Sequence, residues 1–173
     1  RASEKDKSAL APINRGFLTA GILSVIGTLA LALLYVGNTA GSFTKRTGEV
    51  VTTVTNPGWR MFAAVVVGLI LAQVLSKLTE YFTSTEHKPV IEIAESTRTG
   101  PATVVLSGTS SGLESSVWSI VAIAIGIGVA IGLGGGNVQF VLYLIALSGM
   151  GMLATTGVIV SEDSFGPVAD NAA

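Results

Sequence analysis

The stretch VWSIVAIAIGIGVAIGL, residues 117–133, carries no charged side chain. A helix that crosses about 30 Å of hydrocarbon needs roughly 20 apolar residues. The helical pattern extends back to Pro101, a residue type that suits the first turn of a helix. The stretch therefore predicts a membrane-spanning helix over 101–133.

Three further apolar runs flank this segment along the chain. Together the four runs predict membrane spans at about 16–37, 58–80, 101–133 and 137–161. The last two are joined by GLGGGN, 132–137, which lacks the Lys-Ser/Thr pair that a phosphate-binding loop requires. We interpret it as a tight turn between antiparallel helices. The chain is thus predicted to be an all-α integral membrane protein, with residues 1–173 forming one partial membrane domain.

The composition supports a membrane protein and excludes several kinds of site. Charged residues make up 12% of the chain and the mean hydropathy is +0.66, whereas soluble domains carry about 25% charged residues. The 21 glycines suit helices that pack closely in a membrane. The absence of cysteine excludes disulfides and thiolate metal sites. A single histidine, His87, and a net charge of −1 exclude histidine clusters and a basic nucleic-acid surface.

Lysine and arginine are divided unequally between the two sides of the predicted bundle. One side holds residues 1–15, 76–100 and the tail after 160, and the other holds the loop 37–58. The first side carries Arg1, Lys5, Lys7, Arg15, Lys77, Lys88 and Arg98, and the second carries Lys45, Arg46 and Arg60. Cytoplasmic loops are enriched in such residues. The distribution therefore places the tail in the cytoplasm and the loop 37–58 outside.

The first part of the third predicted helix is too polar for contact with lipid. It reads GPATVVLSGTSSGLESS, 100–116, and Gly108 and Gly112 have the spacing of closely packed membrane helices. We expect its serine hydroxyls to face other helices: Ser107, Ser110, Ser111 and Ser115. Glu114 either lies at the membrane interface or lines a polar pathway. Because four helices offer little protein to cover this face, we expect Ser107, Ser111 and Glu114 to lack partners within the chain.

Two charged stretches lie on the predicted cytoplasmic side. The first, TEYFTSTEHKPVIEIAESTRTGPAT at 79–103, is typical on its own of a solvated amphipathic connector. The second is the tail SEDSFGPVADNAA at 161–173, in which Gly166-Pro167 predicts a turn between Asp163 and Asp170. Carboxylates without nearby Cys or His suit Mg²⁺, which takes one or two carboxylates together with substrate phosphates. The two acids predict a partial Mg²⁺ site.

The same two stretches resemble motifs of membrane-bound ion-pumping inorganic pyrophosphatases. EYFTSTEHKPVIEIAESTRTGPAT is similar to the family's EYYTS…KPV…IAES…TGAAT, and DSFGPVADNAA is similar to its DAYGPISDNAGG. The order of the motifs and the two spans between them also match. Phe82 and Phe165 replace tyrosines of the family, and Ala172-Ala173 stand where it often has Ala-Gly.

The resemblance implies a larger protein of which this chain is an internal fragment. It implies about sixteen transmembrane helices in a homodimer that hydrolyses pyrophosphate to phosphate and pumps H⁺ or Na⁺ across the membrane. The chain would supply roughly the eighth to the eleventh helices, be truncated inside the second motif, and be inactive without the rest of the polypeptide. The implied location is a prokaryotic cell membrane, with the active site facing the cytoplasm.

The resemblance also assigns roles to individual residues. Asp170 matches the aspartate that binds the Mg²⁺ ions holding pyrophosphate. Asp163 matches an aspartate near the same site, as a second candidate for metal binding or catalysis. Glu80 and Arg98 match motif positions for which substrate contact and a structural role both stay open. K⁺ is implied as a further candidate activator.

Two other functions stay open on the residues alone. Glycine-rich helices with polar residues also occur in secondary ion or solute transporters, and a non-catalytic membrane scaffold is a third reading. A transporter places its acids near the middle of the membrane, whereas Asp163 and Asp170 follow the end of an apolar run. Their position favours an active site that a soluble phosphate substrate can reach.

Overall fold

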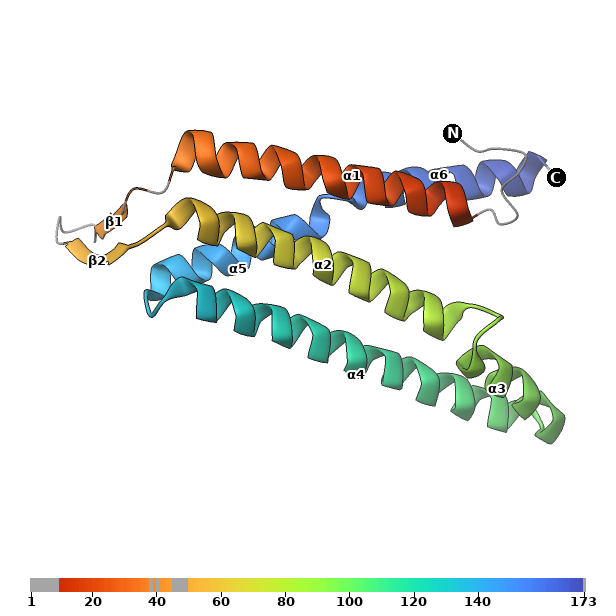
Figure 1. Cartoon of the computed structure of the whole chain (residues 1–173). Coiled ribbons are helices and arrows are strands. Elements are labelled where there is room, and N and C mark those ends of the chain that lie inside the picture. Colours follow the sequence, from red (N-terminus) through yellow and green to blue (C-terminus); the bar gives the residue numbers. More distant parts are fainter. Residues whose placement is uncertain (1–9, 38, 40, 45–49, 173) are drawn as a thin grey trace.

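The computed structural model describes residues 10–37, 39, 41–44 and 50–172. In this part of the chain, four helical segments are long and apolar enough to cross a membrane. Segments that follow one another along the chain run antiparallel in a bundle (Figure 1). The expected all-α fold class is confirmed, and where the bilayer boundaries fall along the helices stays a prediction.

The helices differ in length and regularity. The first segment is α1 (Leu10–Leu31), which continues into a short π-helix, η1 (Ala32–Val36). Then follow α2 (Pro57–Thr83), a short α3 (Lys88–Ser96), a 3-10 turn η2 (Thr97–Thr99) and the longest helix, α4 (Pro101–Gly134). The last segment comprises α5 (Val138–Leu153) and α6 (Thr156–Ala172).

The loop 37–58 contains a β-hairpin that the sequence analysis did not predict. Strands β1 (Gly41–Thr44) and β2 (Val50–Val54) pair antiparallel, with Gly41 opposite Val54 and an irregularity between Phe43 and Thr44. The stretch VVTTV of β2 consists entirely of β-branched residues, which favour strands. Because the loop as a whole is rich in Thr, Gly and Asn, which are typical of irregular segments, this local preference for a strand was not recognised.

Helix α2 is the centre of the bundle and packs against α1, α4 and α5. Its contact with α5 is a backbone-to-backbone approach: a methyl group at Gly68 would collide with the Ser148 carbonyl, and one at Gly151 would collide with the Val65 carbonyl. Such close approach needs small residues, as is usual between membrane helices. The position of α5 is therefore fixed by glycine.

The fourth segment is two helices instead of the single predicted helix over 137–161. Helix α5 ends at Leu153, and α6 begins at Thr156 after a turn at Ala154-Thr155. Beyond the turn the chain leaves α2 and packs against α1, where Gly16 lies beside Val158. The sequence did not predict this break, because apolar composition does not report a local change of backbone among glycine and β-branched residues.

The turn between α4 and α5 follows the sequence prediction. Gly135 and Gly136 have φ angles of 61° and 86°, a region that glycine enters without steric cost. Asn137 caps α5, because its side chain accepts a hydrogen bond from the Phe140 N–H at 3.0 Å. The expected tight turn between antiparallel neighbours is confirmed.

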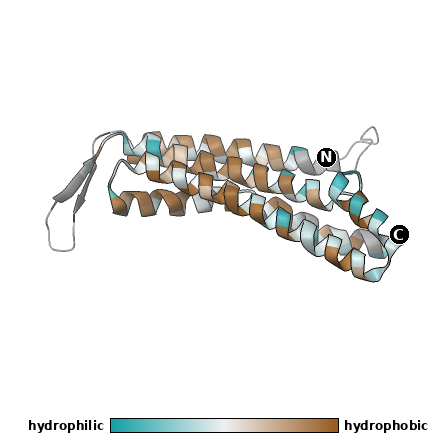
Figure 2. Cartoon of the chain, turned by 90° about the horizontal axis from the view of Figure 1, so that it is seen from below, coloured by the Kyte–Doolittle hydropathy of each residue, from teal (hydrophilic) through white to brown (hydrophobic). Residues whose placement is uncertain are grey.

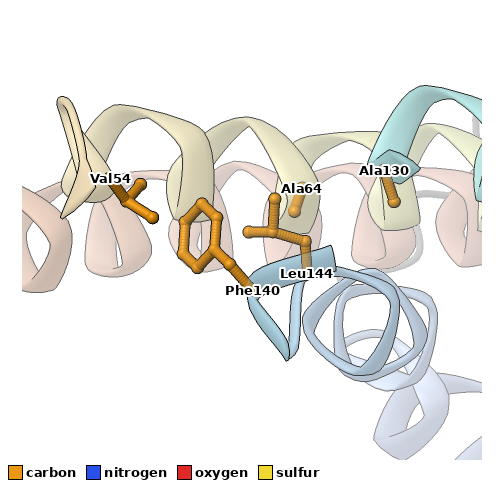
Figure 3. Packing of buried hydrophobic residues seen from close by; sticks show 5 residues of the cluster. All are labelled: Val54, Ala64, Ala130, Phe140 and Leu144. Atoms are coloured by element: carbon orange, nitrogen blue, oxygen red, sulfur yellow. The ribbon is translucent and has the colours of Figure 1, made fainter. Parts of the chain in front are cut away.

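A cluster of buried apolar side chains joins α2, α4, α5 and β2 near the hairpin end of the bundle (Figure 3). Phe140 and Leu144 are 1% and 0% exposed. The cluster is completed by Val54, Ala64 and Ala130. Most other apolar side chains on the four segments are exposed, and at most 22% of the most apolar window of each segment is buried.

The two ends of the bundle differ in polarity. The hairpin and the α4–α5 turn lie at one end, and the start of α1, helix α3 and the end of α6 lie at the other (Figure 1). Apolar residues line the middle of the helices, and hydrophilic residues gather towards α3 and the C-terminus (Figure 2). We call this polar end the α3 end. The candidate site residues lie there.

Candidate functional site

Asp163 lies on α6 and is exposed. The turn expected at Gly166-Pro167 is not formed, because α6 continues through Pro167. Proline has no backbone N–H, so the Asp163 carbonyl four residues earlier receives no helical hydrogen bond. Residue 163 therefore offers two kinds of oxygen at one position, an exposed carboxylate and a backbone carbonyl without its helical partner.

The backbone of Asp170 belongs to the same helix, and its side chain lies outside the described part of the structure. Seven positions separate it from Asp163, which corresponds to two turns and about 10 Å along a helix. Mg²⁺ holds its ligands at about 2.0–2.1 Å. Two aspartates at this separation are too far apart to share one ion. Position 170 is inside α6, so Asp170 does not cap the start of this helix.

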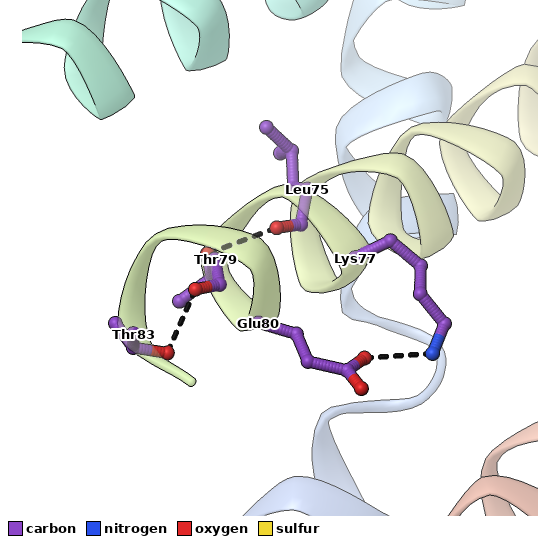
Figure 4. A network of polar contacts seen from close by, with 5 residues as sticks. All are labelled: Leu75, Lys77, Thr79, Glu80 and Thr83. Carbon is purple, nitrogen blue, oxygen red and sulfur yellow. Dashed lines mark hydrogen bonds and ion pairs between the residues drawn. The ribbon is translucent and has the colours of Figure 1, made fainter. Parts of the chain in front are cut away.

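Glu80 lies near the end of α2 and forms an ion pair on the surface (Figure 4). Its Oε2 lies 2.6 Å from Lys77 Nζ, and both side chains are solvent-accessible. Next to them, the Thr79 and Thr83 hydroxyls donate to the carbonyls of Leu75 and Thr79. An exposed pair of this kind contributes less than about 1 kcal/mol. The surroundings of Glu80 are those of a helix terminus.

Arg98 lies on η2 and is exposed. With Thr85, Val90, Ile91, Ala94 and Glu95 it lines a cavity of about 310 Å³. The structure does not bring Arg98 and Glu80 together as a pair, because the described charged partner of Glu80 is Lys77. Helix α6, which carries the two aspartates, packs against α1. The four motif residues thus lie on three elements, α2, η2 and α6, that share the α3 end.

A second cavity at the α3 end was not anticipated from the sequence. It encloses about 330 Å³ between the end of α2, helix α3 and the first half of α4, and we call it the α3–α4 cavity. Its lining consists of Tyr81, Phe82, Lys88, Pro89, Glu92, Ser107, Ser110, Ser111 and Glu114. The serines and Glu114 are spaced three or four residues apart, which places them on one helix face. That spacing was the available signal, but the partner helix α3 was not predicted from the sequence.

The polar face of α4 is only partly covered by the rest of the described chain. Ser107 and Ser111 are half-buried and Glu114 is exposed. Within the described residues, none of the three side chains forms a hydrogen bond or an ion pair. This face of α4 is therefore open to groups that lie outside the described helices.

The described residues do not hold a complete metal centre. In residues 10–37, 39, 41–44 and 50–172, no three side chains of His, Cys, Asp or Glu are grouped closely enough to bind a metal ion. The acidic side chains at the α3 end are instead distributed over α2, α3, α4 and α6.

Comparison with known proteins identifies the family. The model described as "Inorganic H+ pyrophosphatase" matches residues 1–173. The K(+)-insensitive pyrophosphate-energized proton pump of Chloroflexus aurantiacus is 42% identical over 174 residues, covering 98% of this chain and 21% of that protein. The protein with the same name from Streptomyces coelicolor is 39% identical over 175 residues, covering 96% of this chain and 21% of its own length.

A relative with a different named ion matches almost as much of the chain. A candidate K(+)-stimulated pyrophosphate-energized sodium pump of Clostridium tetani is 35% identical over 170 residues, covering 97% of this chain and 22% of that protein. The chain thus spans about a fifth of the length of the curated relatives that it matches. With four apolar helical segments among the described residues and a family match along its whole length, the chain is an integral membrane protein. The chain belongs to the inorganic H⁺ pyrophosphatase family.

Proposed function

We propose that the chain is a four-span segment of a membrane-bound inorganic pyrophosphatase that couples pyrophosphate hydrolysis to the pumping of H⁺ or Na⁺. The observation that carries this proposal is the family match over residues 1–173. The longer relatives leave room for about sixteen helices and for acidic groups beyond those of this chain. The segment on its own would be inactive, since hydrolysis requires several metal ions held in place together.

In this proposal α6 presents oxygen ligands to Mg²⁺ at the α3 end. The donor set fits the ion, because Mg²⁺ prefers carboxylate and carbonyl oxygens, and Asp163 supplies an exposed carboxylate next to a carbonyl freed by Pro167. Asp170 supplies the principal carboxylate, two turns further along. When bound with pyrophosphate, Mg²⁺ would neutralise charge on the phosphate oxygens. The separation of the two aspartates suits ligation of different ions.

Glu80 and Arg98 have smaller roles in this proposal. The ion pair with Lys77 holds Glu80 at the end of α2, which supports a structural role. Arg98 is exposed beside its own cavity, and a guanidinium there can bind phosphate. The α3 end would face the cytoplasm of a prokaryotic cell. The pump would work as a homodimer in the bilayer.

The alternative of a secondary transporter is less well supported. Its acids would lie within the membrane, whereas Asp163 follows the uncharged run 138–160 and lies in the polar part of α6. The curated relatives are named as pyrophosphate-energized pumps of both the K(+)-insensitive and the K(+)-stimulated kind. Because these names differ in the ion and in the response to K⁺, the identity of the pumped ion and the effect of K⁺ on the rate have to be measured.

The test uses the complete protein in membrane vesicles. We expect Asp170→Asn to lower Mg²⁺-dependent phosphate release from pyrophosphate about 100-fold or more, because tenfold is lost for each 1.36 kcal/mol of transition-state stabilisation and metal ions supply several. Pyrophosphate-driven ion uptake should fall in parallel, with the protein still inserted. Glu86→Gln, an exposed acid after α2, is the matched control. Near-normal phosphate release by Asp170→Asn would remove Asp170 from the site, and no phosphate release by the unaltered protein would refute the pump.

A further inference from the structure

The α3–α4 cavity has the size and position of a binding site. Its volume of about 330 Å³ lies within the range of about 300–1,000 Å³ that is usual for small-molecule sites. Three elements line it, since α3 lies beyond the end of α2 and packs on the first part of α4 (Figure 1). None of the residues assigned to the Mg²⁺ site lines it.

The charged side chains of this cavity are not paired with one another. Lys88 and Glu92 from α3 and Glu114 from α4 all contribute to its lining. Within the described part of the chain none of them forms an ion pair, whereas nearby Lys77 and Glu80 do. A cavity with one free ammonium and two free carboxylates is complementary to a ligand that itself carries both signs of charge.

The serine hydroxyls of the cavity are also free. On the other faces of α4 the hydroxyls of Thr109, Ser116 and Ser119 donate to carbonyls of their own helix at 2.8–3.0 Å. Within the described residues, the hydroxyls that line the cavity make no such bond: Ser107, Ser110 and Ser111. A hydroxyl can donate to a phosphate oxygen and accept from an ammonium.

The position of the cavity along α4 matches the level of lipid headgroups. Glu114 is the last charged residue before the uncharged stretch 117–133, and charged side chains in this position mark the membrane interface. Tyr81 lines the same cavity, and tyrosine is enriched at that interface. The cavity therefore lies where the acyl chains of a lipid could remain in the hydrocarbon while its headgroup enters the protein.

We propose that the α3–α4 cavity binds the headgroup of a zwitterionic phospholipid with a primary ammonium, of the phosphatidylethanolamine type. Lys88 binds the phosphate, and Glu92 and Glu114 accept hydrogen bonds from the ammonium. The serine hydroxyls complete the contacts. A primary ammonium has three N–H donors, whereas the quaternary ammonium of phosphatidylcholine has none. Phosphatidylglycerol lacks the cation. This site does not depend on the proposed pumping function.

The main experiment measures lipid retention by the complete purified protein. The protein is equilibrated with equimolar phosphatidylethanolamine, phosphatidylcholine and phosphatidylglycerol in detergent, and retained lipid is counted by native mass spectrometry. We expect preferential retention of phosphatidylethanolamine. Glu114→Gln and Glu92→Gln should each reduce it about tenfold, because a hydrogen bond to a charged group is worth about a factor of ten or more. The control is Glu95→Gln, which lies on α3 but lines the neighbouring cavity.

A second measurement tests whether a lipid or another protein segment fills the α3–α4 cavity. The chain has no cysteine, so Ser111→Cys introduces a thiol into this cavity without native cysteines elsewhere in the chain. We expect a thiol reagent to label it in phosphatidylcholine vesicles and to label it several-fold more slowly when phosphatidylethanolamine is added. Equal retention of the three lipids would overturn the proposal. So would unchanged retention in both glutamine variants, or a thiol shielded in every lipid, which would mean that another protein segment fills the cavity.

Discussion

The guanidinium of Arg60, at the start of α2, donates a hydrogen bond from Nη1 to the Leu133 carbonyl of α4 at 2.9 Å. The last carbonyls of a helix have no partner within it, and a cation at this end is favoured by the helix dipole. Gly135 leaves room for the contact, since a Cβ there would lie 2.6 Å from Arg60 Nη1. One side chain thus joins two spans that are distant in sequence.

Removing this guanidinium should loosen the hairpin end of the bundle. We expect Arg60→Met to lower the free energy of unfolding by about 1.5–3 kcal/mol, the usual contribution of a hydrogen bond to a charged group. Unfolding of the complete protein by a denaturing detergent measures the change. Arg60→Lys keeps the charge and loses the planar fork, so its free energy of unfolding should lie between those of Arg60→Met and the native protein. Equal stability of Arg60→Met and the native protein would show that the contact is not used.

The contact between α2 and α5 should tolerate no added atom at Gly68. We expect Gly68→Ala to destabilise the fold by about 1–3 kcal/mol or more, the usual range for overpacking, because the methyl group would meet the Ser148 backbone. The same detergent titration gives the value. Gly128→Ala is the control, since a Cβ there has open space and alanine favours the helix. If Gly68→Ala and Gly128→Ala unfold alike, the close contact between α2 and α5 does not limit the size of residue 68.

The start of α5 should depend on the cap formed by Asn137. We expect Asn137→Ala to cost about 0.5–2 kcal/mol, because the Phe140 N–H would lose its acceptor. Asn137→Asp keeps an acceptor oxygen and should retain most of the stability. Hydrogen exchange of the first amides of α5 reports the change locally. Unchanged exchange in Asn137→Ala would contradict the assignment of the cap.

Substitution of Thr155, at the break between α5 and α6, should stabilise the fold, unlike the substitutions above. It is 1% exposed and its hydroxyl has no hydrogen-bond partner in the described structure. Thr155→Val, which removes the buried polar atom at nearly constant shape, should raise the free energy of unfolding by about 1–3 kcal/mol, the penalty of an unsatisfied group. Thr155→Ser keeps the hydroxyl and serves as the control. A loss of stability in Thr155→Val would reveal a partner for the hydroxyl.

The fold was predictable wherever hydrophobicity alone determines the structure. The uncharged stretch 117–133 suffices for a spanning helix, and the glycine-rich turn after it suffices for antiparallel neighbours. The break at Thr155 and the strand 50–54 were missed. Both depend on local backbone preferences that the apolar or polar character of the whole segment conceals. A helix that continues through Pro167 shows the reverse case, where its surroundings override a local signal.

The candidate site was predictable as a set of residues and not as an arrangement. The motifs identified Asp163, Asp170, Glu80 and Arg98, but sequence order does not tell which elements meet in space. The pairing of Glu80 with Lys77 follows from their spacing on one helix. The α3–α4 cavity does not follow from spacing, because it exists only where α3 folds back onto α4.

The turn at Ala154-Thr155 determines where the residues of α6 lie relative to α5. Glycine contacts hold α5 against α2, whereas α6 packs against α1 and carries Asp163 in its middle and Asp170 near its far end. The turn thus sets the direction of α6, which measures about 20 Å from Thr156 to Asp170. A change of about 10° in that direction would displace residue 170 by roughly 3–4 Å, which exceeds the Mg²⁺–oxygen distance of about 2.0–2.1 Å.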